Sequence, residues 1–517
     1  MEFPLTVFLM KKSCMKLRSM RLIKNRQHNN YWFRALVAGA LSTGSLLSQC
    51  WFTQPVAAQT KDYCQLSSEA EQKKESLRQA WLKGNSNAER DYKRLLQEHA
   101  ELIDKCRSQS WLKNQAIWLR LYPCDARPGE IDALLDRIVN QGYNQVYVEV
   151  FFDGQVLLPV NDNPTPWVSA VRSPGAENVD LLAEAIKKGR ERGLEVYAWL
   201  FTMNFGYSYA QRPDRQQVLA RNGRGENSLS VVQGGSEAFI DPYNRQAKVD
   251  YYRLVQAVVK RKPDGILFDY IRYPRGTGTQ SVAGHVEDLW IYGDAARAAL
   301  YQRAQNQRGR ALIERFLSQG HIKASDVEAV EKLYPGEGEP MWQGRIITPT
   351  PVSTATSSNL AKLQLDLWHL TVAHAAQGVI DFLTLASQPA QRQGIPAGAV
   401  FFPGGNQAVG QRGYDSRLQP WDKFPASLQW HPMSYAVCGT ADCIVEQVQR
   451  VVNRAPNQTK VIPALAGVWG KAYQNRPSLE VQMEAIRRQV PEIDSVSHFA
   501  YSWQQPESDS DRKFCRL

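Results

Sequence analysis

Several functional signatures are missing from this sequence of 517 residues. It contains no glycine-rich phosphate loop and no Gly-x-Ser-x-Gly segment, the marks of P-loop enzymes and of α/β-hydrolases. Cys438 and Cys443 have no second Cys or His pair at zinc-ligand spacing, and His369 and His374 fall on different faces of a predicted helix, so we expect no metal and no cofactor. Cysteine is scarce and 43% of the chain is hydrophobic, which excludes a disulfide knot, collagen and a disordered chain.

A basic excess is also missing from the part of the chain that follows residue 58. The formal charge of +11 arises mostly in residues 1–58, which hold eight Lys and Arg residues against Glu2 alone, whereas the remainder carries 54 basic and 50 acidic residues. No run of Lys and Arg interleaved with aromatic residues follows. A mixed surface of this kind does not favour nucleic acid as a partner.

Residues 1–58 have the order of a secretory signal peptide, with a basic stretch, an apolar segment at 35–52 and an Ala-Ala cleavage signal. We expect cleavage before Gln59 and export to the periplasm, the cell envelope or the extracellular space, with no stable membrane span afterwards. An uncleaved anchor and a lipidated Cys50 are the alternatives. Polar residues interrupt the apolar segment, which disfavours the anchor.

Six cysteines follow this leader, which suits an oxidising compartment; they are residues 64, 106, 124, 438, 443 and 515. Residues 59–112 contain two helical stretches separated by a Gly-Asn-Ser-Asn turn, and an antiparallel hairpin would bring Cys64 next to Cys106. A disulfide there contributes about 4 kcal/mol in the chain-entropy model. Cys438 and Cys443 stand close in Cys-Gly-Thr-Ala-Asp-Cys, a loop that a local disulfide would pin.

From residue 116 onward, short β-branched or aromatic runs alternate with amphipathic helices, as in βα units around a parallel sheet. Eight strand candidates lie at 116–121, 145–151, 195–201, 265–270, 399–402, 427–435, 460–466 and 497–503. Eight such units close a (β/α)8 TIM barrel, which we place at 113–505 and follow with a tail at 506–517. The stretch 274–360 is too long for a loop, so we expect inserted helices over or beside the barrel mouth.

Strand parity places charged side chains inside this barrel. On the second strand the valines at 146, 148 and 150 must face the helices, so Glu149 points inward near the strand's end, and Asp153 follows in the loop. On the fourth strand Asp269 takes the inward position at the mouth, where barrel enzymes carry their reactive groups. Arg120 on the first strand also points inward.

The segment 262–274, Lys-Pro-Asp-Gly-Ile-Leu-Phe-Asp-Tyr-Ile-Arg-Tyr-Pro, resembles the fourth-strand motif of the bacterial glycosyl-hydrolase-like family ten. Residues 144–151 and 196–200 look like that family's second and third strands, and residues 239–242 look like its aspartate-proline turn. The resemblance implies a TIM barrel and an exported glycosidase acting on polysaccharide. Peptidoglycan glycan strands are a substrate class of the family.

Glycoside hydrolysis requires two carboxyl groups that flank the scissile bond. The resemblance and the position at the mouth both make Asp269 the main catalytic carboxylate; the alternative is a buried structural aspartate held by Arg272 or Arg120. The candidates for its partner are, in order of preference, Glu149, Asp153, and Asp415 or Asp422. Glu149 also has an alternative role, because an ion pair with Arg120 would satisfy both inward charges.

Aromatic and polar side chains at or just beyond the strand ends offer platforms and hydrogen bonds for sugar rings. The predicted substrate contacts are Trp199, Asn204, Tyr270, Tyr273, His431, Tyr435, Tyr501 and Trp503. Some aromatic residues must instead be ordinary core, and a lone histidine in a barrel is as often a core residue as a ligand.

The sequence therefore predicts an exported glycoside hydrolase with a polysaccharide or oligosaccharide substrate. The alternative is a carbohydrate-binding barrel of the cell envelope without turnover, because a fold does not fix a function. The distance from the carboxyl group of Asp269 to a partner discriminates between the two, since catalytic pairs stand roughly 5 to 9.5 Å apart.

Overall fold

The computed structural model describes residues 63–232, 235–347 and 356–515, the last range with side chains from residue 359. The predicted signal peptide and its cleavage site before Gln59 lie outside these ranges. Across the described residues, no helix combines the length and the apolar character that a membrane span requires.

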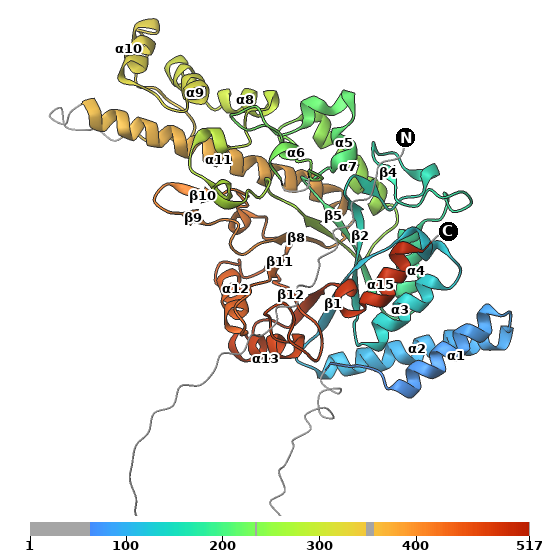
Figure 1. Cartoon of the computed structure of the whole chain (residues 1–517). Coiled ribbons are helices and arrows are strands. Elements are labelled where there is room, and N and C mark those ends of the chain that lie inside the picture. The colour runs from blue at the N-terminus through green and yellow to red at the C-terminus, as the bar shows by residue number, and fades with distance from the viewer. Residues whose placement is uncertain (1–62, 233–234, 348–355, 516–517) are drawn as a thin grey trace, which may run out of the picture. The chain divides into compact units, whose positions relative to one another are not determined.

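Eight parallel strands close into a barrel surrounded by helices, which confirms the predicted (β/α)8 fold (Figure 1). The strands pair in the order β1, β2, β5, β6, β8, β11, β12, β13, and β13 pairs again with β1. Their bounds are β1 Asn114–Arg120, β2 Gln145–Phe152, β5 Glu195–Phe201, β6 Gly265–Asp269, β8 Ala397–Phe401, β11 Gln429–Ser434, β12 Ala464–Ala466 and β13 Ser495–Phe499.

Helices between the strands cover the outside of the barrel. They are α3 (Glu130–Asn140), α4 (Leu181–Arg190), α7 (Arg245–Val259), α11 (Thr356–Gln391), α12 (Asp442–Val452) and α13 (Leu479–Gln489). Val146, Val148 and Val150 of β2 are completely buried. The strand is therefore covered on both faces, as parallel strands inside a helical layer require.

The seventh and eighth strands differ most from the ranges that the sequence predicts. The seventh begins at Ala464 and not at residue 460, because Pro463 has no N–H group to donate to the ladder. The eighth ends at Phe499, and the chain then turns into the short helix α14 (Tyr501–Gln504). Tyr501 and Trp503 therefore lie on a helical turn beyond the strand.

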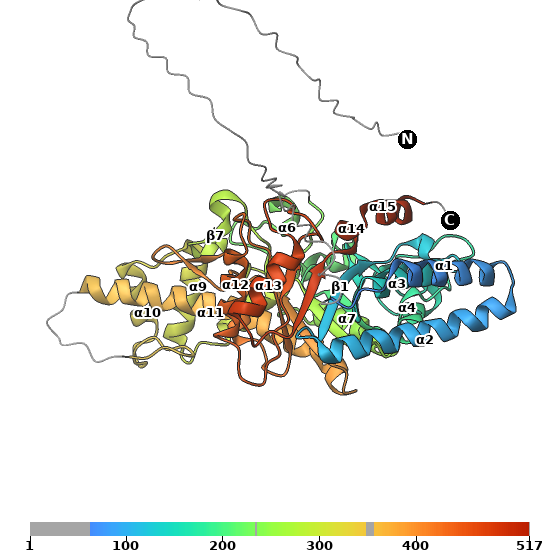
Figure 2. The ribbon, with the colours of Figure 1, turned by 90° about the horizontal axis from the view of Figure 1, so that it is seen from below.

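A helical hairpin precedes the barrel, formed by α1 (Ser68–Leu82) and α2 (Ser86–Gln109). A disulfide joins Cys64 to Cys106, with 5.7 Å between their Cα atoms. Figure 2 shows the hairpin side by side with α3 and α4. The structure also contains the Cys438–Cys443 disulfide.

A buried ionic network attaches this hairpin to the barrel helices. The guanidinium of Arg192 is fully buried and pairs with Asp132 and Asp136, each at 2.9 Å. Tyr92 of α2 donates its hydroxyl hydrogen to Asp136 at 2.7 Å and accepts a hydrogen bond from Arg192 at 2.7 Å. The network therefore joins side chains from α2, α3 and the turn after α4.

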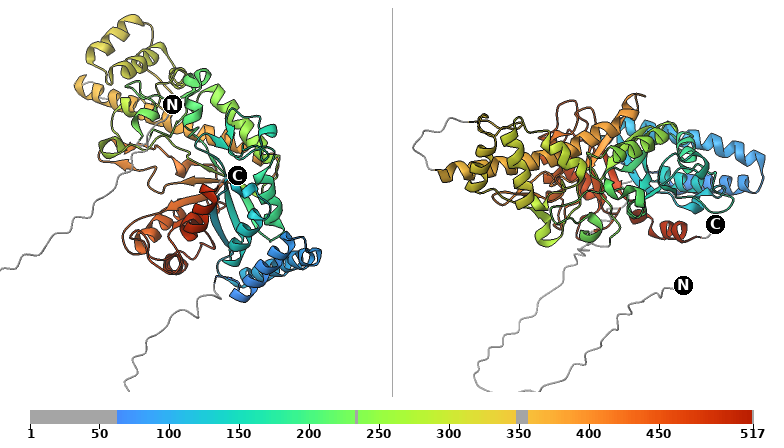
Figure 3. Two further views of the ribbon diagram at one scale, coloured as in Figure 1. Left: turned by 45° about the vertical axis from the view of Figure 1, so that its right-hand side comes forward. Right: turned by 90° about the horizontal axis from the view of Figure 1, so that it is seen from above.

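The insertion after β6 contains the helices α8 (Asp294–Tyr301), α9 (Gln307–Gln319) and α10 (Ala324–Leu333). Figure 3 shows α9 and α10 beside the N-terminal half of α11, where Gln364 accepts a hydrogen bond from Ile322 N–H at 2.9 Å. Buried residues of the insertion belong to the same core cluster as the barrel; they include Val286, Trp290, Leu300, Leu312 and Phe316. The insertion is therefore packed onto the barrel.

The start of the insertion lies beside the loops of the barrel mouth. Its strand β7 (Val282–Ala283) pairs with β10 (Gly413–Asp415), which belongs to the loop between β8 and β11. A cleft lies between the insertion and the loops that follow β5, β6 and β8; its lining includes Arg224, Pro274, Ala283, Trp290 and Ser416.

The predicted C-terminal tail contains a helix. Helix α15 (Pro506–Phe514) is attached to the residues after β1, since Arg512 pairs with Asp125 at 2.7 Å and a disulfide joins Cys515 to Cys124. Both contacts connect the two ends of the barrel sequence.

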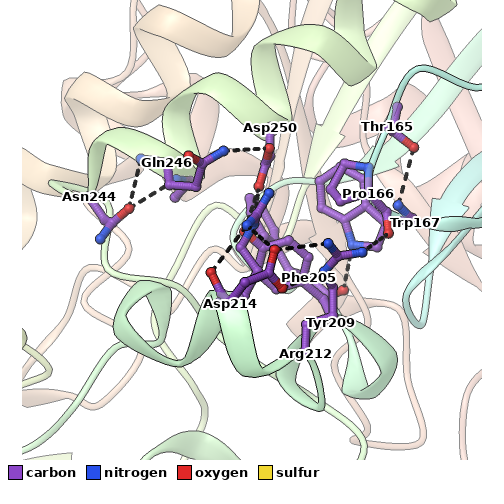
Figure 4. A network of polar contacts seen from close by, with 12 residues as sticks. Thr165, Pro166, Trp167, Phe205, Tyr209, Arg212, Asp214, Asn244, Gln246 and Asp250 are labelled. Carbon is purple, nitrogen blue, oxygen red and sulfur yellow. Dashed lines mark hydrogen bonds and ion pairs between the residues drawn. The ribbon is translucent and has the colours of Figure 1, made fainter.

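The long loop between β5 and α7 is anchored at several points (Figure 4). Trp167 donates its indole hydrogen to the carbonyl of Phe205 at 3.0 Å, and Asp250 of α7 accepts the hydroxyl hydrogen of Tyr209 at 2.8 Å. Asn244 caps α7 by accepting from the N–H groups of the first turn. The loop is thus tied down at both ends.

Candidate active site

Asp269 is the last residue of β6 and lies at the C-terminal end of the barrel, as the sequence predicts. The N–H of Tyr270 donates to Oδ1 at 2.6 Å, and the indole N–H of Trp199 donates to Oδ2 at 3.1 Å. The residue is 6% exposed. Burial, and to a smaller extent the charge of Glu237, raise the pKa of Asp269 to about 6 against the opposing effects of these hydrogen bonds and of the charge of Arg272.

Tyr270 takes a constrained conformation immediately after this carboxyl group. Its φ of 52° lies in the left-handed region, which a bulky side chain rarely adopts. The Tyr270 ring packs on the ring of Phe201, with 4.2 Å between the two centroids. The Arg272 guanidinium carbon lies 4.6 Å from the centroid of the Tyr270 ring. The turn therefore directs the ring across the mouth beside Asp269.

Arg272 is a buried cation without an ion pair among the described residues. It is 7% exposed, and only its Nη1 makes a hydrogen bond to the described residues, donating to the carbonyl of Tyr273 at 3.0 Å. Its charge acts on Asp269 and Tyr270, and burial lowers its own pKa. The guanidinium therefore supplies positive charge to the mouth without being neutralised by a direct contact.

Glu149 points into the barrel, where parity places it, but it is enclosed. The strands align it with Arg120 on one side and with Trp199 on the other. Arg120 Nε donates to Oε2, while Oε1 is buried with no partner in the described part of the chain. Burial raises the pKa of Glu149 to about 7, and Arg120 opposes the rise. The interior ion pair considered from sequence is thus present.

The other predicted acids lie in different surroundings. Asp153 is exposed in the loop after β2, with a φ of 46°. Asp415 forms a two-point ion pair with Arg417, with both hydrogen bonds at 2.7 Å. Asp422 accepts a hydrogen bond from Asn406 at 2.7 Å. Asp415 and Asp422 are therefore engaged in their own loop contacts.

Aromatic rings line one side of the mouth around Phe499. Trp199 lies 6.4 Å from Phe499, Tyr435 lies 5.7 Å from it and Trp503 lies 5.9 Å from it, measured between ring centroids. Trp118 packs edge-on against Trp199 at 4.8 Å from below. Three predicted substrate contacts, Trp199, Tyr435 and Trp503, are thus brought together around Phe499, and Trp199 connects this group to Asp269.

Three other predicted contacts are buried away from this surface. Tyr273 is completely buried and donates its hydroxyl hydrogen to the carbonyl of Ala375 in α11 at 3.3 Å. Tyr501 is 1% exposed and bonds Arg137 and Ser508 through its hydroxyl group. His431 is completely buried in the barrel interior, 5.7 Å from the ring of Tyr147, and burial lowers its pKa to about 3.

Asn204 is a backbone anchor. It is 1% exposed, and its Oδ1 accepts hydrogen bonds from the N–H groups of Gly206 at 3.1 Å and Ala238 at 3.0 Å. It therefore fixes the loop after β5 and does not present its carbonyl oxygen to a ligand.

Glu237 is a carboxyl group of the mouth that the sequence analysis missed. It is partly buried, and its Oε1 accepts the hydroxyl hydrogen of Tyr270 at 3.3 Å. It lies in the loop between β5 and α7, where neither strand parity nor helix periodicity indicates the direction of a side chain. Its only sequence signal is its place four residues before the Asp241-Pro242 turn.

A metal site is not evident in this arrangement. Within the residues that the structure describes, no group of three or more His, Cys, Asp or Glu side chains is placed to hold a metal ion. The groups at the mouth are carboxyls, arginines and aromatic rings, a set suited to proton transfer and to binding polar rings.

The chain matches a known family over its first half-barrel. The model of the family Glycosyl hydrolase-like 10 matches residues 110–301, which confirms the resemblance that the fourth-strand motif indicates. The matched range runs from just before β1 through β6 to α8. A search of curated proteins found no match.

Solved structures of glycosidases are similar to this chain at low identity. A β-galactosidase from Bacillus circulans sp. alkalophilus is 13% identical over 75% of this chain and 50% of its own, with a TM-score of 0.44. A GH20 β-N-acetylhexosaminidase from Streptomyces coelicolor A3(2) is 8% identical over 78% of this chain and 62% of its own, with a TM-score of 0.36. A GH18 chitinase from Pseudoalteromonas aurantia is 12% identical over 75% and 94%, with a TM-score of 0.34. The chain thus spans less than two thirds of the first two.

Proposed function

We propose that this protein is an exported glycoside hydrolase that cleaves glycosidic bonds in a polysaccharide, with Asp269 as its central carboxylate. The observation that carries the proposal is the setting of Asp269 at the C-terminal end of β6. Both of its oxygen atoms accept N–H hydrogen bonds, it is nearly buried, and an aromatic surface adjoins it. Reactive groups of (β/α)8 enzymes lie at this end of the barrel.

The hydrogen bonds of Asp269 suit a carboxylate that acts in its charged form. Two N–H donors hold both oxygens in fixed directions, so the charge can face the carbon at which positive charge develops during glycoside cleavage. The rings of Trp199, Tyr435 and Trp503 supply the apolar platforms on which sugar rings stack.

Glu149 serves this site as a structural ion pair. Its carboxyl group is bound to Arg120 and enclosed, so a substrate does not reach it without moving that arginine. Breaking a buried pair of this kind is costly because one charge is left without compensation. Asp153 is exposed at the rim, where it is accessible to a bound glycan.

Peptidoglycan glycan strands are the first substrate that we propose, because the family resemblance implies this class. Export agrees with the predicted signal peptide and with three disulfides in the described residues, since disulfides persist in oxidising compartments. We therefore place the protein in the periplasm, the cell envelope or the extracellular space.

A carbohydrate-binding barrel without turnover is the second candidate function. The enclosure of Glu149 favours it, because the carboxyl group first expected to act with Asp269 is occupied by Arg120. Product formation distinguishes hydrolysis from binding, whereas affinity for a glycan does not.

The test is a glycan panel incubated with the protein that begins at Gln59. Peptidoglycan strands with and without stem peptides, chitin oligosaccharides, and neutral α- and β-glucans are each incubated and analysed by mass for new reducing ends. Release of oligosaccharides from one class, lost in the D269N variant, supports the hydrolase. Binding without release from any member of the panel supports the second candidate.

A further inference from the structure

Glu237 and Asp269 are linked through a single residue. The backbone N–H of Tyr270 donates to Asp269 at 2.6 Å, and the phenol hydroxyl of the same tyrosine donates to Glu237 at 3.3 Å. The two carboxyl groups therefore stand at opposite ends of one tyrosine. They are also close enough to interact electrostatically, since the charge of Glu237 raises the pKa of Asp269.

The backbone around Glu237 is clamped on both sides. The Ser228 hydroxyl donates to the carbonyl of Glu237 at 2.8 Å and accepts from the N–H of Phe239 at 2.9 Å. Asn204 accepts from the N–H of Ala238 at 3.0 Å. None of these three hydrogen bonds involves the Glu237 side chain, so the loop positions the carboxyl group and leaves it available for chemistry.

Arg272 couples the two acids electrostatically. The charges of Glu237, Asp269 and Tyr270 act on its guanidinium, and it makes no ion pair of 4.0 Å or less with the described residues. One buried cation thus faces two carboxyl groups without neutralising either by contact. The positive charge of Arg272 offsets the electrostatic repulsion between the two carboxylates, so they can lie near one another.

We propose that Glu237 is the second catalytic carboxyl group, the one that passes a proton to the departing sugar while Asp269 faces the anomeric carbon. The inference rests on the proposed glycosidase function and assigns the second half of its machinery. Glu237 suits proton exchange because it is only partly buried and touches a hydroxyl group that can orient its proton.

The proposed step balances as a hydrolysis. Protonated Glu237 gives its proton to the glycosidic oxygen as the bond from that oxygen to the anomeric carbon breaks. The carboxylate of Asp269 either takes a proton from the water that attacks the anomeric carbon, or itself bonds to that carbon. In the second case the Glu237 carboxylate then takes a proton from a water molecule, which attacks the anomeric carbon and breaks its bond to Asp269. One water molecule is consumed, one sugar hydroxyl leaves and one new anomeric hydroxyl forms, and proton exchange with solvent restores both acids.

Glu149 and Asp153 fit this role less well. Glu149 has one oxygen bound to Arg120 and the other enclosed, so its proton has no path to a leaving group at the mouth. Asp153 is exposed and its charge acts on Tyr270, but its side chain makes no hydrogen bond or ion pair with the described residues that would position it for proton transfer.

The test compares wild-type protein with E237Q on glycosides of one sugar that carry different leaving groups. The glutamine keeps the acceptor for Tyr270 but cannot donate an acidic proton. We expect kcat/KM to fall by about 10² to 10⁴ on the natural glycan, and much less on a dinitrophenyl glycoside, whose leaving group needs no proton. E184Q, at a partly buried glutamate on α4, is the matched control and should keep the wild-type rate on both substrates.

The pH profile gives a second readout that a structural role would not move. Asp269 is faced by Arg272, Glu237, Trp199 and Tyr270. Loss of the Glu237 proton donor should remove the basic limb of kcat/KM and leave in place the acidic limb, which the ionisation of Asp269 sets. If E237Q keeps both the wild-type rate and the wild-type pH profile while D269N is inactive, the role of Glu237 is wrong and the proposed function stands. A wild-type protein that cleaves no glycan overturns the proposed function together with this role.

Discussion

The indole nitrogen of Trp199 donates a hydrogen bond to Asp269 across two adjacent barrel strands, at 3.1 Å. The ring of Trp199 is also in edge contact with Trp118 at 4.8 Å and faces Phe499 at 6.4 Å. One side chain therefore orients the carboxylate and forms part of the aromatic surface beside it. In the proposed glycosidase, substrate binding and carboxylate orientation would therefore be coupled through Trp199.

Replacement of Asp269 by asparagine should abolish turnover and leave the fold intact. The amide keeps nearly the same volume and can still accept from Tyr270 N–H, but it carries no charge to stabilise the transition state. We expect a loss of at least about 10² to 10⁴ in kcat/KM on the glycan that the panel identifies. The midpoint of thermal unfolding should change little.

Asp264 provides the matched control for this experiment. It lies just before the other end of the same strand, where it accepts from Val196 N–H at 2.8 Å and pairs with Arg190 at 2.8 Å. D264N should lower the unfolding temperature and keep turnover per folded molecule. Near-normal turnover of D269N would remove Asp269 from the chemistry.

Replacement of Trp199 by phenylalanine should shift the acidic limb of the pH profile upward. The indole hydrogen bond lowers the pKa of Asp269, so its loss raises that pKa above about 6. If the charged carboxylate is the active form, the rate falls as the pH drops through this pKa, and the limb moves to higher pH by about half a unit to one unit. kcat/KM between pH 4 and 8 is the measurement.

W118F is the control for the tryptophan experiment. Trp118 packs against the same ring but donates its indole hydrogen to Ser497 at 3.0 Å. The W118F variant should be less stable than the wild type but should keep the acidic limb of the pH profile at the same pH. Equal shifts in both variants would show that packing, and not the hydrogen bond to Asp269, sets the pH dependence.

The barrel strands could be predicted because both of their faces are specified by the sequence. The buried valines of β2 determine the inward direction of Glu149, and the same parity places Asp269 at the mouth. The ends of the strands could not be predicted from the same pattern. Pro463 delays β12, and the helical turn after Phe499 redirects Tyr501, and neither feature changes the hydrophobic pattern that defines a strand.

Residues beyond the strands could be placed only in part, because loops have no periodicity from which to read direction. Tyr273 belongs to the same sequence motif as Asp269. The chain turns at Tyr270, however, and the Tyr273 side chain contacts α11 and not the mouth. Glu237 is positioned by Ser228, whose hydroxyl donates to its carbonyl, and by Asn204, which accepts from Ala238 N–H and is 34 residues away from it in the sequence. Contacts of this kind are set by the tertiary structure and leave no local pattern.

The Cys64–Cys106 disulfide should make a large contribution to stability. It spans 42 residues, and the chain-entropy model assigns a loop of that size about 4 kcal/mol, compared with about 2 kcal/mol for the five-residue span of Cys438–Cys443. Non-reducing peptide mass mapping of protein beginning at Gln59 should recover the linked peptides. Serine pairs at the two sites should lower the free energy of unfolding in this order, and free thiols at residues 64 and 106 would contradict the pairing.

Replacement of Arg192 by methionine should destabilise the protein without altering the chemistry at the mouth. The side chain is fully buried and holds Asp132, Asp136 and Tyr92 together, so its removal leaves buried carboxylates with fewer partners. Breaking such a pair typically costs about 3 to 5 kcal/mol.

R190M, two residues earlier, is the natural comparison for R192M because its ion pair with Asp264 is exposed, with 49% of the arginine side chain accessible. An exposed pair contributes about 0 to 1 kcal/mol, so R190M should unfold close to the wild-type midpoint in urea. Both variants should keep kcat/KM at temperatures where they are folded, since the network lies in the helical layer outside the barrel. Equal stability of the two variants would show that the buried network contributes no more than a surface contact, and loss of turnover in folded R192M would show that the hairpin and the mouth are coupled.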